Sequence, residues 1–155
     1  MKKWHQYFKF SSTKSRYFKA HYALLLIITI VSMVRSLLHI FLADGGASTI
    51  ATIPLDLYSD AARATIVSMF AFWGLAQLMV GLVMVYILLA KKENSLLLYY
   101  FLILEYGGRL LISWFKPFET VQTAPGAIGN YVFLILGIVV ISAHALFVQL
   151  NKRLA

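Results

Sequence analysis

The sequence predicts an all-α integral membrane protein, an antiparallel four-helix bundle with both termini in the cytoplasm. Hydrophobic residues make up 61% of its 155 residues, well above the roughly 45–50% usual in soluble domains. Four apolar runs, at about 22–43, 64–90, 96–115 and 131–150, are each long enough to cross a hydrocarbon core about 30 Å thick as a helix. The tight turn after residue 90 indicates that the second and third helices are antiparallel.

The basic residues predict the orientation. Of the 14 Lys and Arg residues, six precede residue 21, two form Lys91-Lys92 and two form Lys152-Arg153. The opposite loops are mildly acidic. Because Lys and Arg are retained on the cytoplasmic side of membrane proteins, both termini and the Lys91-Lys92 turn are expected there.

The chain is expected to have two parts. Residues 1–20 mix Lys and Arg with aromatic side chains, which is typical of a cytoplasmic or interfacial segment that contacts membrane lipids. Residues 21–155 form the four-helix transmembrane domain. A cleaved signal peptide is not expected, because the basic region is long and Arg35 and His39 interrupt the apolar run.

The sequence excludes one class of function and argues against a second. The chain has no cysteine, which removes disulfides, thiolate metal sites and thiol redox chemistry. The net charge of +8 is compatible with nucleic-acid binding, but the basic residues gather at the ends of the apolar runs. The positive-inside rule explains that placement, and no nucleic-acid partner is expected.

Charged side chains inside two of the apolar runs predict a polar layer. Glu105 and Arg109 lie one helical turn apart in the third run, and Arg35 lies in the first. A charge at a helix centre in hydrocarbon costs roughly 2.5–3.5 kcal/mol, so these side chains are expected to face protein. Arg35, Gln77 and Arg109 are each thirteen residues from the cytoplasmic end of their runs, a common height of about 20 Å.

These residues predict a polar pocket that opens to the outside. The expected ligand-binding residues are Arg35, His39, Gln77, Glu105, Tyr106 and Arg109. Because guanidinium groups outnumber carboxylates, an anionic or amphiphilic small molecule, or a lipid headgroup, is the expected ligand, bound or transported. A polar quinone-like ring is another candidate.

Two other functions remain open on the sequence. Glu105 can bridge Arg109 and Arg35 with no ligand, as in an accessory or structural subunit of a larger membrane complex. The protein can also be a small membrane enzyme in which Glu105 or His39 acts as acid or base on a lipid-soluble substrate. No catalytic residue is assigned, and whether the protein is an enzyme stays open.

No metal or cofactor is expected. The acidic residues and His39 lack the ligand spacing of a helix-borne metal site, and the two arginines oppose a cation. Haem would need two facing histidines, and His21 and His144 are expected at different heights along their helices.

Several short motifs resemble a known group. They are Asp44-Gly45-Gly46 after His39, Thr52-Ile53-Pro54-Leu55-Asp56, Trp73-Gly74-Leu75-Ala76-Gln77, Glu105-Tyr106-Gly107-Gly108-Arg109, Lys116-Pro117 and Pro125-Gly126. Over residues 22–150 this layout is similar to small uncharacterised bacterial four-span membrane proteins, loosely the DoxX-like group. The resemblance implies a compact four-helix bundle in the bacterial cytoplasmic (inner) membrane, and it carries over no catalytic residue.

Overall fold

The fold consists of four long helices in a computed structural model that describes residues 16–154. The helices are α1 (Arg16–Phe41), α2 (Asp60–Ala90), α3 (Leu96–Phe115) and α4 (Pro125–Leu154), with short 3-10 turns η2 (Leu55–Leu57) and η3 (Lys92–Asn94). All four α-helices are long and apolar enough to cross a membrane. The predicted all-α class is therefore confirmed for the described residues, and the four apolar helices support a multi-pass membrane protein.

Three of the helices are longer than the predicted apolar runs. α4 begins at Pro125 instead of 131, because proline fits the first turn of a helix, where its missing N–H needs no partner. α2 begins at Asp60, after Ser59, whose hydroxyl accepts a hydrogen bond from the Ala62 N–H and so caps the helix. α1 begins at Arg16, inside the segment expected over 1–20. Residues 1–15 of that segment lie outside the described residues.

The connection after α1 turns sharply at two glycines. Gly45 and Gly46 have φ values of +60° and +74°, a left-handed conformation that glycine adopts readily and that prevents α1 from continuing. Asp44 accepts hydrogen bonds from the N–H groups of Gly46, Ser48 and Thr49. Partial burial raises the pKa of Asp44, but these bonds outweigh it and leave the pKa below its ordinary value.

α1 and α2 pack closely at glycines. A Cβ atom on Gly74 would lie 2.8 Å from the His39 Cβ, and one on Gly81 would lie 2.8 Å from the Met33 Cγ. Polar side chains of α1 face the interior of the protein, since Thr29, Ser36 and His39 are buried. Small residues beside polar ones therefore bring the two helices together, as expected for membrane helices.

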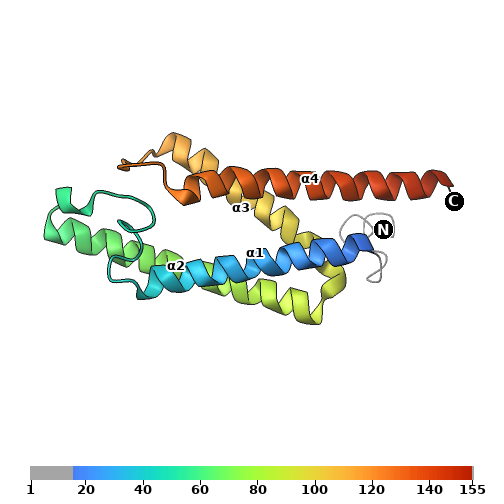
Figure 1. The fold of residues 1–155 in the computed structure, drawn as a ribbon, viewed down its shortest axis with the longest axis horizontal. Coiled ribbons are helices and arrows are strands. Elements are labelled where there is room, and N and C mark those ends of the chain that lie inside the picture. The colour runs from blue at the N-terminus through green and yellow to red at the C-terminus, as the bar shows by residue number, and fades with distance from the viewer. Residues whose placement is uncertain (1–15, 155) are drawn as a thin grey trace.

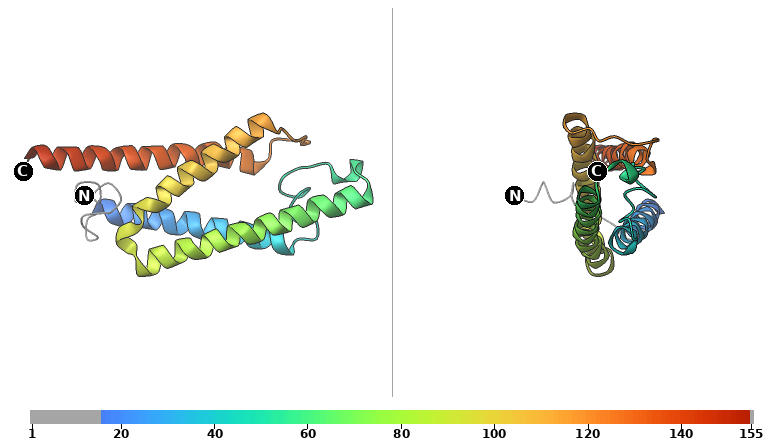
Figure 2. Two further views of the ribbon diagram at one scale, coloured as in Figure 1. Left: turned by 180° about the vertical axis from the view of Figure 1, so that it is seen from behind. Right: turned by 90° about the vertical axis from the view of Figure 1, so that its left-hand side faces the viewer.

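α3 and α4 form a second pair, in which a Cβ atom on Gly137 would lie 2.8 Å from the Ile103 Cγ1. Figure 1 shows the start of α1, the end of α4 and the η3 turn at one end of the molecule, here called the terminal end. The connections 42–59 and 116–124 lie at the other end, here called the loop end. α2 and α3 leave the η3 turn together and diverge toward the loop end (Figures 1 and 2).

The two helix pairs are joined by hydrogen bonds near both ends. At the terminal end the Tyr99 hydroxyl donates to the backbone carbonyl of His21, over 3.1 Å. At the loop end the Thr52 hydroxyl donates to the Gln122 carbonyl, and the Val121 N–H donates to the Thr52 carbonyl. The polar cluster described next lies between these two links.

Candidate functional site

A chain of polar contacts crosses from α1 through α2 to α3. The Arg35 guanidinium donates to the Gln77 side-chain oxygen (3.1 Å), and the Gln77 nitrogen donates to Glu105 Oε1 (3.4 Å). Arg109 forms an ion pair with the same Glu105 oxygen. We call these four residues, Arg35, Gln77, Glu105 and Arg109, the polar cluster. The Gln77 side chain can bridge the two ions because an amide offers both a donor and an acceptor.

Trp73 completes the cluster and was not predicted as a site residue. Its ring centroid lies 4.9 Å from the Arg109 guanidinium carbon and 5.7 Å from that of Arg35. A cation near an aromatic face is stabilised by the ring quadrupole, so one tryptophan serves both arginines. One feature of the sequence indicates that Trp73 lies near the cluster, since it precedes Gln77 by four residues and shares its helix face.

Tyr106 lies beside the cluster, buried between α3 and α4. Its ring packs against Phe133 with centroids 4.9 Å apart, and its face lies 5.2 Å from the Arg109 guanidinium carbon. The side chain also interacts electrostatically with Arg35. Tyr106 therefore contacts Arg109 and lies close enough to Arg35 to interact with it electrostatically, while its ring packs within the α3–α4 pair.

His39 lies on the loop side of the cluster and does not line the cavity described below. Its Nδ1 is 2.7 Å from the Gly45 carbonyl oxygen. A carbonyl only accepts, so Nδ1 carries the proton in this contact. The ring packs against Trp73 and Phe70, with centroids 4.9 and 5.5 Å apart. His39 thus fixes both the end of α1 and the position of Trp73.

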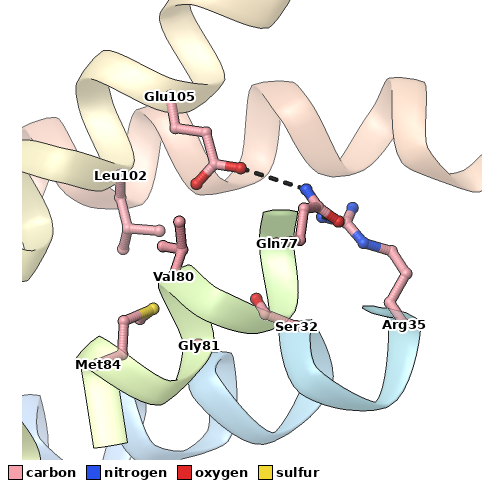
Figure 3. Close-up of a pocket in the computed structure, with 8 residues that line it drawn as sticks. All are labelled: Ser32, Arg35, Gln77, Val80, Gly81, Met84, Leu102 and Glu105. Carbon is pink, nitrogen blue, oxygen red and sulfur yellow. Dashed lines mark hydrogen bonds between the residues drawn. The ribbon is translucent and has the colours of Figure 1, made fainter. Parts of the chain in front are cut away.

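A small cavity lies directly against the cluster (Figure 3). Its volume of about 20 Å³ is room for about one water molecule. The lining residues come from α1, α2 and α3: Ser32, Arg35, Gln77, Val80, Gly81, Met84, Leu102 and Glu105. By helix order, Arg35, Gln77 and Glu105 form its loop-end side, and most of the lining toward the terminal end is apolar. The cavity is therefore amphipathic along the direction of the helices.

The charges of the cluster do not balance within the chain. Arg109 is paired with Glu105, whereas Arg35 reaches that carboxylate only through Gln77. The buried Arg35 Nε has no hydrogen-bond partner among the described residues. The other five acidic residues lie at helix ends or in connections: Asp44, Asp56, Asp60, Glu93 and Glu119. One guanidinium therefore lacks a counter-ion from this protein.

Within residues 16–154 no group of three or more His, Asp or Glu side chains is placed to hold a metal ion. His21 and His144, expected at different heights, lie close enough to interact electrostatically between α1 and α4. The last residues of α4 extend beyond the start of α1 (Figure 1), so heights counted from the ends of the predicted runs do not compare these two helices correctly.

Comparison of the chain with protein-family models, curated proteins and solved structures finds no match. The resemblance to DoxX-like proteins therefore stays a prediction, as do the ligand-binding roles of the six site residues. What the structure adds is their arrangement: four of them form the polar cluster, Tyr106 contacts it, and His39 supports it through Trp73.

Proposed function

We propose that this protein is a four-span bundle in the bacterial cytoplasmic membrane that binds or transports an anionic or amphiphilic small molecule at the polar cluster. The observation that carries the proposal is the surplus guanidinium of Arg35 and Arg109 beside Glu105. An unneutralised charge within the hydrocarbon is costly, so an anion supplied from outside the chain is strongly favoured there.

The depth of the cluster supports this placement. Arg109 is the fourteenth of the 20 residues of α3, which puts it about 10 Å from the loop end of the helix. The basic residues favour a cytoplasmic terminal end and an outer loop end. The cluster then lies in the outer half of the membrane, within reach of molecules from the outer side.

The ligand test is thermal unfolding of the purified chain in a neutral detergent. Phosphate, sulfate and carboxylates of different chain length are added one at a time. At least one anion is expected to raise the midpoint in the wild type but not in Arg35→Gln. Lys116→Gln, which removes an exposed cation at the end of α3, is the matched control and should respond as the wild type does. If no anion stabilises the wild type more than Arg35→Gln, the proposal fails.

A second candidate is an accessory subunit whose cluster only holds the helices together. Gln77 favours this role, because its single side chain joins α1 to α3 with no ligand. The exposed apolar residues along all four helices would then be partly covered by a larger complex. Extraction in mild detergent should in that case retain a partner, and recovery of a homogeneous monomer would contradict it.

A further inference from the structure

The exposed edge of the polar cluster lies on an exposed face of α3. The Glu105 side chain is 37% exposed and that of Arg109 18%. Phe101 and Gly108 share the helix face of Glu105, at spacings of four and three residues. Phe101 is 54% exposed, and a Cβ atom on Gly108 would meet nothing within 4 Å. The carboxylate is therefore reached from the side of α3 and not only along the bundle axis.

On α2 an exposed apolar residue likewise lies one turn from a residue of the polar cluster. Val80, one turn from Gln77 toward the terminal end, is 52% exposed and also lines the cavity. Phe101 lies one turn from Glu105 in that same direction on α3. Two exposed apolar side chains thus lie beside the cluster toward the membrane centre, on helices that diverge toward the loop end (Figure 2).

We propose that the ligand is a long-chain anionic amphiphile that enters sideways between α2 and α3 from the leaflet at the loop end. This inference rests on the proposed function and names its ligand class. The anionic head pairs with the surplus guanidinium at Arg35 and Arg109. The chain runs toward the membrane centre along Val80 and Phe101, which is the direction that the tail of a lipid in that leaflet already takes.

The size of the cavity favours an amphiphile over a compact organic anion. Its volume of about 20 Å³ admits about one water-sized group, so the bulk of a ligand must lie outside it. A lipid meets this condition because only its head approaches the cluster, while the chain stays at the exposed surfaces of α2 and α3.

Trp73 provides a direct reporter of this contact. The full chain with Trp4→Phe and Trp114→Phe keeps Trp73 as its sole tryptophan, within 6 Å of both guanidinium groups. In nanodiscs of zwitterionic lipid, stearate brominated near the carboxylate should quench Trp73 more than stearate brominated near the chain end. The apparent affinity should exceed that of a brominated monoacylglycerol roughly tenfold, the factor contributed by about one charge-assisted hydrogen bond.

The outcomes separate the two proposals. Arg35→Gln should abolish the preference for the anionic lipid, Arg35→Lys should retain part of it, and Lys116→Gln should leave it unchanged. Equal quenching by anionic and neutral lipids in the tryptophan-reduced parent would overturn the amphiphile. The amphiphile proposal would also be overturned if aqueous phosphate stabilised the protein through Arg35 and displaced the brominated stearate. The proposed anion site would still stand in that case. If no anion of either kind depends on Arg35, both proposals fail.

Discussion

The Arg109 guanidinium carbon lies 4.9 Å from the ring centroid of Trp73 and joins the α3–α4 pair to the α1–α2 pair. Together with the Gln77–Glu105 hydrogen bond, this contact holds α2 against α3 at a level where the two helices already diverge. Apolar packing does not fix their separation there, because Val80 and Phe101 are about half exposed. Substitutions that change the charge of the polar cluster should therefore alter the distance between α2 and α3.

Glu105 and Arg109 should be energetically coupled. Either Glu105→Gln or Arg109→Gln leaves a charge without its partner and should cost roughly 1–3 kcal/mol, reduced from a fully buried pair by the exposure of Glu105. The double variant should lose less than the sum, which equilibrium unfolding in detergent can measure. Asp60→Asn removes a fully exposed partner of Arg63 and should have no measurable effect. Additive losses would contradict the coupling.

Two glycines should respond in opposite ways to the same substitution. In Gly74→Ala the new Cβ would lie 2.8 Å from the His39 Cβ and 2.9 Å from the Ser36 carbonyl, so α1 and α2 must separate, at a cost of about 1–3 kcal/mol. Gly108→Ala meets open space and should be neutral or stabilising by up to about 1 kcal/mol, since alanine favours helix. Thermal unfolding in detergent compares them, and equal losses would argue against the close helix contact.

The link at Thr52 should hold the two loops together. Thr52→Val removes the hydroxyl that binds the Gln122 carbonyl and should cost about 1 kcal/mol. Thr52→Gly loses the same bond but relieves the positive φ of 59°, which is unfavourable for a β-branched residue. Limited proteolysis of residues 116–124 should therefore be fastest in Thr52→Val. Faster cleavage of Thr52→Gly than of Thr52→Val would show that the backbone is unstrained.

Asp44 should make the stability of the loop end depend on acid pH. Its folded pKa lies below the ordinary value of 3.8, so its stabilising effect is complete above that value and is lost as the pH falls through the folded pKa. Asp44→Asn should cost roughly 1 kcal/mol at pH 7, and its difference from the wild type should shrink as the pH falls below about 4. A difference that stays constant down to pH 2 would contradict this role.

The sequence by itself determined that the helices are apolar enough for a membrane, how many there are, and that Arg35, Glu105 and Arg109 lie near one another. An apolar run long enough to cross a membrane is expected to be a helix, because in hydrocarbon every backbone N–H and C=O group must be hydrogen-bonded within the segment. The cost of burying Glu105, Arg109 and Arg35 in hydrocarbon indicated that they would face one another. Helix starts were less predictable, as at Pro125, because proline favours both a loop and a first helical turn.

Only the tertiary structure decided what surrounds the charges. Three features depend on how closely helices from distant parts of the chain approach each other. They are the position of Trp73 near both guanidinium groups, the hydrogen bond of His39 to Gly45 and the exposed edge of Glu105. That separation is set by glycine contacts such as Gly74 and by the divergence of α2 from α3. Spacing along one helix fixes which residues share a face, but not the distance to the helix opposite.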